Sequence, residues 1–127
     1  MINLNGAAIY LSGPMAGSLY YNRAGFAEAE AMLYNLGARI VFNPCEHYRK
    51  GGKLPDWSTY ECMRRNLSIL TGGASHKPNF DMMVLLDGWE YSKGSNAERM
   101  CAEVIGMPIH TLREIEADQT MAFWEGR

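Results

Sequence analysis

The sequence predicts an α/β domain of three layers, in which a four- or five-stranded, mainly parallel sheet lies between helices, as in Rossmann-like or flavodoxin-like folds. Short apolar runs alternate along the chain with longer segments of helical periodicity, and strands joined through helices pair in parallel. The run MMVLL (82–86) is apolar at every position, which is typical of a central strand covered on both faces. The chain has 127 residues, so we expect one domain over 1–127.

The first half of the chain predicts two strands around one long helix. AIYLS (8–12) is short and apolar, and it stops at the turn signal GPMAG. Residues 21–37 carry apolar side chains at helical spacing and end at Gly37, a residue favoured just past a helix. ARIVF (38–42) is the second expected strand, and Asn43-Pro44 ends it.

The second half predicts two further strands, each preceded by a helix. Residues 56–70 show helical spacing, with Tyr60 on the apolar side. FDMMVLLDG (80–88) is the third expected strand, residues 95–106 form the next helix, and MPIHTL (107–112) is the fourth strand. The tail that follows is expected to begin as a helix.

Composition and charge argue against several classes of function. The formal net charge is −2 and there is no run rich in Lys and Arg, so we expect no nucleic-acid polymer as a partner. No apolar stretch approaches the roughly 20 residues that span a bilayer. The N-terminus also lacks the features of a signal peptide, so we expect a cytoplasmic protein without membrane contact.

The cysteine, histidine and glycine patterns argue against metal, disulfide and dinucleotide sites. The three cysteines form no C-x-x-C pair, so we expect free thiols in a reducing compartment. The three histidines do not stand at ligand spacing, and we expect no bound metal. Neither G-x-G-x-x-G nor a Walker A loop is present, so we expect no cofactor.

Three loops are the candidates for a ligand site. Ligands of open parallel sheets bind outside the carboxyl ends of the strands, where the strand order reverses. That rule selects GPMAG (13–17), NPCEH (43–47) and DGWEYSKGS (87–95). Asp87 ends the third strand, where it can contact a ligand or form a simple turn. Tyr10 on the first strand can pack in the core or direct its hydroxyl to this crevice.

Glu98 has two interpretations, as a helix cap or as a reactive group. Ser95 stands ahead of it in the pattern S-x-x-E, which is a capping box at the start of a helix. The helical spacing instead puts Glu98 at the edge of a buried stripe, with its carboxylate towards the crevice. The expected stripe comprises Ala97, Met100, Cys101, Val104 and Ile105.

Five segments together resemble the nucleoside 2-deoxyribosyltransferase superfamily, over about residues 7–110. They are IYLSGPMAG, VFNPCEH, the W-x-x-Y-x-x-M-R segment, DMMVLLDGWEYSKGSNAE and IGMPI. The pattern G-W-x-x-S-x-G-[SA]-x-x-E is the most specific part, and the chain is most similar to a small, mostly phage-borne branch. The superfamily also includes deoxynucleoside 5′-monophosphate N-glycosidases.

The resemblance implies that Glu98 is a nucleophile that attacks C1′ of a nucleoside or nucleotide and expels the base. A glycosyl-enzyme intermediate then passes to water or to a second base, as in retaining glycoside cleavage. The resemblance further implies that the Tyr10 hydroxyl orients this nucleophile. Asp87 or Asp81 would protonate the leaving base or hold the sugar or the base edge.

The resemblance also implies contacts with substrate on the first and third loops, at Gly13, Met15, Ser92, Gly94 and Ser95. In the monophosphate-cleaving members, the serine and glycine that precede the nucleophile hold the 5′-phosphate. This match favours a nucleotide over a nucleoside. Those members also carry an arginine where this chain has Ala16, so one anion contact is missing.

Two functions follow from this reasoning. The first is N-glycosidic bond cleavage or transfer on a (deoxy)nucleoside 5′-monophosphate or a nucleoside. The alternative is a non-catalytic nucleotide-binding protein that controls nucleotide pools or sequesters a nucleotide signal of host defence. In both, the partner is a small nucleotide or nucleoside, and a phage-borne chain would act in the host cytoplasm. We also expect a homodimer or higher homo-oligomer, with Phe123 and Trp124 as interface groups.

Overall fold

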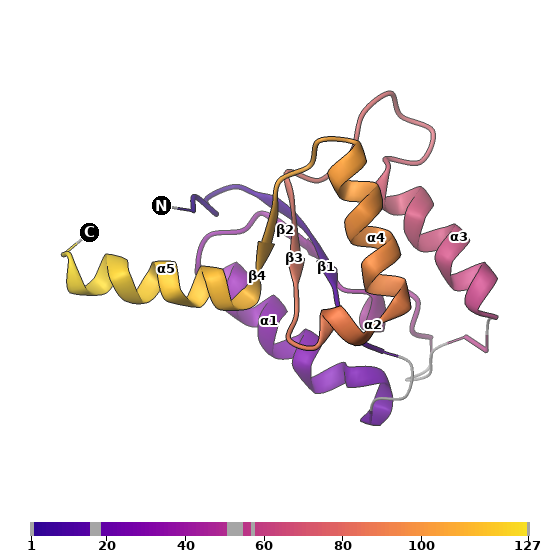
Figure 1. Cartoon of the computed structure of the whole chain (residues 1–127), viewed down its shortest axis with the longest axis horizontal. Coiled ribbons are helices and arrows are strands. Elements are labelled where there is room, and N and C mark those ends of the chain that lie inside the picture. Colours follow the sequence, from indigo (N-terminus) through magenta and orange to yellow (C-terminus); the bar gives the residue numbers. More distant parts are fainter. Residues whose placement is uncertain (1, 16–18, 51–54, 57, 127) are drawn as a thin grey trace.

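The computed structural model describes residues 2–15, 19–50, 55–56 and 58–126, and it contains a four-stranded sheet that is parallel throughout (Figure 1). The strands are β1 (Ala8–Ser12), β2 (Ile40–Phe42), β3 (Met82–Leu85) and β4 (Ile109–Thr111). Their order across the sheet is β2-β1-β3-β4. The prediction of an α/β fold with a four- or five-stranded, mainly parallel sheet is confirmed.

Helices cover both faces of the sheet and produce three layers (Figure 1). The α-helices are α1 (Arg23–Asn35), α2 (Pro44–His47), α3 (Thr59–Leu70), α4 (Lys93–Val104) and α5 (Leu112–Trp124), and two 3-10 turns are η1 (Leu19–Asn22) and η2 (Trp89–Tyr91). Helices α1 and α5 lie against one face, and α3 and α4 lie against the other. None of the helices in the described part of the chain has the length and apolar character needed to cross a membrane.

The alternation of side chains along β1 separates two cores. Ile9 and Leu11 point into the core that α1 and α5 close. Tyr10 points to the opposite core, which α3 and α4 close. Because successive strand residues face opposite sides, Ser12 shares the face of Tyr10, and this arrangement brings two hydroxyl groups under α4.

The strand order creates one switch point in the sheet. The chain passes from β1 to β2 on one side and from β3 to β4 on the other side. β1 and β3 pair from Ile9↔Met82 to Ser12↔Leu85, and the carboxyl ends of these two strands mark the switch point, which is where sheets of this kind bind ligands.

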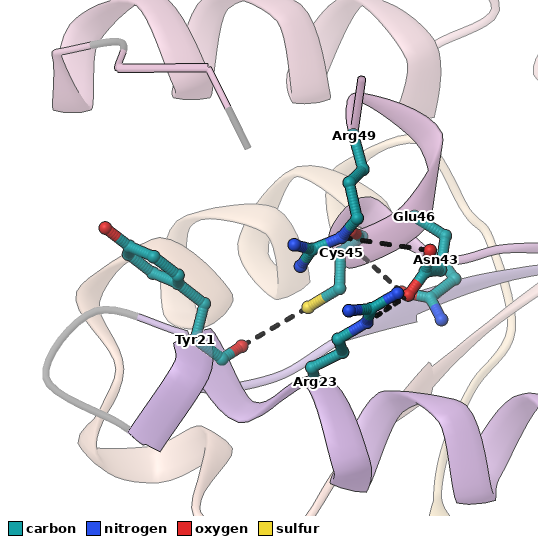
Figure 2. Close-up of polar contacts among 6 residues, drawn as sticks. All are labelled: Tyr21, Arg23, Asn43, Cys45, Glu46 and Arg49. Atoms are coloured by element: carbon teal, nitrogen blue, oxygen red, sulfur yellow. Dashed lines mark hydrogen bonds and ion pairs between the residues drawn. The ribbon is translucent and has the colours of Figure 1, made fainter. Parts of the chain in front are cut away.

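A short helix, α2, occupies the loop that the sequence analysis left unstructured after β2. Its start follows ordinary capping rules, because Pro44 stands at the first position and the Asn43 side chain accepts the Cys45 N–H at 2.9 Å. Figure 2 shows how this turn is tied to the segment before α1: the Cys45 thiol donates to the Tyr21 carbonyl at 3.2 Å. Burial raises the pKa of the Cys45 thiol to about 11, so this thiol is chemically quiet.

The other boundaries are close to expectation, with one clear error. Helix α1 ends as predicted before Gly37, whose φ is +105°. Helix α3 begins at Thr59 because Ser58 caps it by accepting the Glu61 N–H. Tyr60 was predicted on the apolar side of that helix, but its side chain is 75% exposed. All three cysteines are free thiols, as predicted.

Candidate active site

Helix α4 starts earlier than the sequence indicated, and this changes which serine caps it. Ser92 is the N-cap, and its hydroxyl accepts the Ser95 N–H at 3.2 Å. Ser95 therefore lies inside the first turn, and the capping box predicted between Ser95 and Glu98 is wrong. Serine is a favoured N-cap residue, and its hydroxyl accepts the N–H of the residue three positions later. Both Ser92 and Ser95 meet this requirement, so the sequence does not distinguish them.

The buried face of α4 is polar, contrary to the predicted apolar stripe. Its buried residues are Ser95, Glu98 and Ala102. Met100 is 59% exposed and Val104 is 80% exposed, so these two expected core positions face outwards, whereas Cys101 of the same predicted stripe packs against the core. The physical reason is the surface beneath the helix, where β1 presents hydroxyl groups that pair with polar side chains. Glu98 lies in the middle of the buried face and not at its edge.

The Glu98 carboxylate is held at both oxygen atoms by side chains of β1. The Tyr10 hydroxyl donates to Oε2 through a short hydrogen bond. The Ser12 hydroxyl donates to Oε1 at 2.7 Å, and the Ser12 and Ser95 hydroxyl oxygens are 3.0 Å apart. The side chains come from the β1 end and the first turns of α4, so the switch point of the sheet is where the carboxylate lies.

Burial and hydrogen bonding act on Glu98 in opposite directions. Glu98 is 6% exposed, and desolvation raises its pKa, while the hydrogen bonds from Tyr10 and Ser12 lower it. No ion pair to Glu98 is found among the described residues. Burial and the charge of Glu98 raise the pKa of Tyr10 well above its ordinary value. Tyr10 therefore stays protonated at neutral pH and remains a donor.

Aromatic rings form the wall behind Tyr10. Tyr10 stacks on Phe42 with ring centroids 4.9 Å apart, and Phe80 meets it edge-on at 5.5 Å. His47 and Tyr48 extend this wall from the end of α2. Desolvation raises the pKa of Tyr48 to about 12, with a smaller upward contribution from the charge of Glu98. The packed rings fix the Tyr10 hydroxyl in place.

The first turn of α4 contains the residues expected to meet a phosphate. The Ser95 N–H is bound by the Ser92 side chain and the Asn96 N–H by the Ser92 carbonyl. Within the described residues, the N–H groups of Lys93 and Gly94 have no hydrogen-bond partner. A Cβ added at Gly94 would lie 3.5 Å from Met63 Sδ, an ordinary contact, so packing does not itself require glycine there. Ser95, by contrast, points inward to Ser12.

Gly13 and Met15, in the loop after β1, have packing roles in the structure. A Cβ at Gly13 would lie 2.8 Å from Leu86 Cβ, so glycine is required where the ends of β1 and β3 approach each other. Met15 packs against the core on the α1 and α5 face, away from Glu98. Ala16, where the resemblance expects an arginine, lies outside the described residues.

The structure does not bring the two aspartates of interest to Glu98. Asp87 is 64% exposed at its side chain and forms an ion pair with Arg113 at 3.0 Å. It lines a hollow of about 360 Å³ on the α1 and α5 face of the sheet. Asp81 lies before β3, at the opposite edge of the sheet, where its carboxylate accepts the Ala8 N–H at 2.8 Å.

A second hollow, larger than the one beside Asp87, is also separate from Glu98. It has a volume of about 630 Å³ and runs along the outer edge of β2, between Phe42, His47, Ile69 and Phe80. Tyr10 separates this hollow from the carboxylate, because its ring packs against the lining residues Phe42 and Phe80. No group of three or more His, Cys, Asp or Glu side chains in the described chain is placed to hold a metal ion.

Ser12 is the site residue that the sequence analysis did not identify. The signal was present, because residues two apart on a strand share a face and residues three apart on a helix are neighbours. Tyr10 with Ser12, and Ser95 with Glu98, satisfy those two spacings. The sequence did not show that the pair on β1 and the pair on α4 contact each other in the folded protein.

The fold and the site together define an α/β protein that holds a buried carboxylate between hydroxyl groups at the switch point of a parallel sheet. The chain belongs to the family described as Domain of unknown function (DUF4406), whose model matches residues 7–111. No curated protein matches the chain. No solved structure matches it either.

Proposed function

We propose that this protein cleaves the N-glycosidic bond of a nucleoside 5′-monophosphate or nucleoside, with Glu98 as the nucleophile. The observation that carries the proposal is the Glu98 carboxylate itself, which is buried at the switch point with Tyr10 on one oxygen and Ser12 on the other. A carboxyl group whose pKa is shifted by burial, at the place where such sheets bind ligands, is a candidate for catalysis. The resemblance to the nucleoside 2-deoxyribosyltransferase superfamily supplies the reaction class.

The proposed chemistry has two covalent steps. A Glu98 oxygen bonds to C1′ as the C1′–N bond breaks, and the bonding electron pair leaves with the base. Water, or a second base, then attacks C1′ and returns the electron pair to the carboxylate. Tyr10 keeps the carboxylate pointed at C1′ and, because its own pKa is raised, does not lose its proton to Glu98.

A 5′-phosphate on the substrate is supported by the start of α4. Its first turn offers the N–H groups of Lys93 and Gly94 beside the Ser92 hydroxyl, and the positive end of a helix favours anions. Ser95 is assigned no phosphate contact, because its hydroxyl is turned to Ser12. The proposal therefore retains Ser92 and Gly94 as phosphate contacts.

The leaving base is not assigned an acid from Asp81 or Asp87. Asp81 binds backbone at the far edge of the sheet, and Asp87 is paired with Arg113 on the other face. A leaving base still has to gain a proton. The proposal leaves that proton to the solvent or to the bound nucleotide.

The burial of Glu98 favours a second candidate, which is nucleotide binding without catalysis. Only 6% of Glu98 is exposed, and both of its oxygens already accept hydrogen bonds. A nucleophile needs a free lone pair directed at C1′, whereas a structural carboxylate does not. In this alternative the protein binds a nucleotide at the same edge of the sheet and releases it unchanged.

Incubation with a panel of nucleosides and 5′-monophosphates, followed by chromatography, separates these candidates. The proposal predicts free base from at least one monophosphate and its loss in Glu98→Gln. Recovery of every compound intact, or full activity in Glu98→Gln, would contradict it. Binding measured by calorimetry, with the bound nucleotide recovered unchanged, would instead support the non-catalytic alternative.

We further propose a cytoplasmic homo-oligomer. The support is the exposed apolar surface on two helices: Met100 and Val104 on α4, and Phe123 and Trp124 near the end of α5. Light scattering during gel filtration tests this proposal. A monomeric mass at every concentration would overturn it.

A further inference from the structure

Ser12 is buried, and its backbone is held by strand pairing. It is the last residue of β1, it is 1% exposed, and it pairs with Leu85 in the register of β1 and β3. Its carbonyl accepts the Leu86 N–H at 2.9 Å. The backbone on both sides is therefore held, and the hydroxyl has a defined position below α4.

The hydroxyl groups of Ser12 and Ser95 form a directed chain that ends on Glu98. A hydroxyl has one proton to donate and can accept at the same time. Because Ser12 donates to Glu98 Oε1 at 2.7 Å, its oxygen accepts the Ser95 proton across the 3.0 Å that separates them. The Ser95 backbone is anchored in turn by the Ser92 cap. The order of donation is thus Ser95 to Ser12 to Glu98.

We propose that Ser12 is a positioning residue for Glu98, supported by Ser95, and that it stabilises the carboxylate in its charged, attack-ready orientation. This inference rests on the proposed function for its role in catalysis. Tyr10 holds one carboxylate oxygen and Ser12 holds the other, so the plane of the carboxylate is set by two donors. Hydrogen bonds to a charged acceptor are stronger than neutral ones.

The contribution of Ser12 differs between the two covalent steps. When Glu98 bonds to C1′, the carboxylate loses its negative charge and the Ser12 hydrogen bond weakens. When water attacks C1′, the C1′–O bond breaks, its electron pair returns to Glu98, and the Ser12 hydrogen bond strengthens. The donor therefore makes Glu98 a better leaving group, and its loss should slow breakdown of the glycosyl-enzyme intermediate.

Other titratable groups surround the carboxylate and have to be considered in any pH experiment. Tyr10 on β1 contacts Glu98, and the Tyr48 phenol beyond α2 interacts with it electrostatically. From α3, Cys62 and Arg65 act on Tyr48, and from α4, Cys101 acts on Tyr10. None of these groups is altered by a change at Ser12, so a shift in the titration of Glu98 in that variant reports the lost hydroxyl.

The first experiment measures Glu98 directly and needs no substrate. The protein is labelled with carboxyl-¹³C glutamate, and the Glu98 signal is assigned by its absence in Glu98→Gln. We expect the Glu98 midpoint to move to higher pH in Ser12→Ala, to return towards the wild-type value in Ser12→Thr, and to move by a smaller amount in Ser95→Ala. Ser68→Ala, at an exposed position on α3, is the matched control. An unchanged midpoint in Ser12→Ala would overturn the proposal.

The second experiment measures turnover on the monophosphate that the wild type cleaves. We expect Ser12→Ala to lower kcat by about 10- to 100-fold, with a small effect on KM. The acidic limb of its kcat/KM profile should move to higher pH, and intact-mass spectrometry should show more glycosyl-enzyme than in the wild type. Ser12→Thr should recover most of kcat. A rise in KM with an unchanged kcat would contradict a positioning role for Ser12. If the wild type releases no base, the proposed function fails, while the titration still decides whether Ser12 stabilises the Glu98 charge.

Discussion

Glu98 and Asp87 both belong to the stretch that follows β3, yet their surroundings are opposite. Asp87 is exposed and paired with Arg113 on the α1 and α5 face. Glu98 lies on the buried face of α4, has no ion pair among the described residues, and is held by hydroxyl groups of β1. One carboxylate is solvated and neutralised, and the other is desolvated and held by neutral donors.

This difference shows that the burial of Glu98 costs free energy of folding, whereas the exposure of Asp87 does not. A desolvated carboxylate without a cation destabilises the folded state unless hydrogen bonds compensate it. An exposed pair such as Asp87 and Arg113 contributes little in either direction. A position at the end of a strand is therefore weak grounds for a catalytic role, whereas the unfavourable burial of a carboxylate at the switch point of the sheet is stronger grounds.

The two carboxylates should differ most in their importance for catalysis. Glu98→Gln should lower base release by about 10³-fold or more, because the amide cannot form the glycosyl-enzyme bond. Asp87→Asn should change kcat by less than about 3-fold, since its partner is a surface arginine. Both variants are assayed on the same monophosphate. A severe loss of kcat in Asp87→Asn would instead identify Asp87 as a catalytic residue.

Tyr10→Phe should produce the next largest effect. The variant keeps the stacking on Phe42 but removes the hydrogen bond to Glu98 Oε2. We expect kcat to fall by about 10- to 100-fold, with the fold retained by circular dichroism. Wild-type turnover in this variant would show that Glu98 does not depend on the Tyr10 hydroxyl.

The stability of the protein should depend on pH through Glu98. Burial raises the pKa of Glu98 in the folded state, so the folded protein keeps a proton that the unfolded chain loses above about pH 4. Its stabilising effect is complete below the unfolded pKa and is lost as the pH rises through the folded pKa. The Glu98→Gln variant has no titrating group at this position, so its Tm should exceed that of the wild type once the pH is above the folded pKa of Glu98. Thermal scans between about pH 4 and pH 8 should show the two curves converging at the acid end; parallel curves would argue that Glu98 is not desolvated.

The smallest effect is expected at the exposed pair. Asp87→Asn should shift Tm by no more than about 2 °C, and added salt should abolish even that change. The matched change Arg113→Gln should give the same small shift. A large, salt-insensitive loss of stability would mean that the contrast between the two carboxylates is overstated.

Much of the fold was predictable because its signals are local. The apolar run of β3, the end of β1 at Ser12 and the Gly37 stop each depend on neighbouring residues, and the structure has these features where they were expected. The short helix α2 was missed although Asn43-Pro44 is an ordinary helix start. The site was predictable in part: the contact between Tyr10 and Glu98 followed from the resemblance, and Ser12 did not.

The phase of α4 was the principal error, and its cause is physical. Counting apolar residues assumes that the surface under a helix is apolar. Here the surface carries Tyr10 and Ser12, so α4 turns Ser95 and Glu98 inward and leaves Met100 and Val104 outside. A pattern within one helix contains no information about the chemistry of the strand that it will cover.

The parallel α/β architecture, and with it the position of the switch point, could be derived from the sequence, since periodicity and turn chemistry act over a few residues. The choice of the serine that caps α4, of the face of that helix that is buried, and of the carboxylate that is desolvated depended on the tertiary structure. Those outcomes depend on contacts such as that between Ser12 and Glu98, which stand 86 positions apart. Such contacts form only when the sheet brings distant segments together, so no local pattern could specify them.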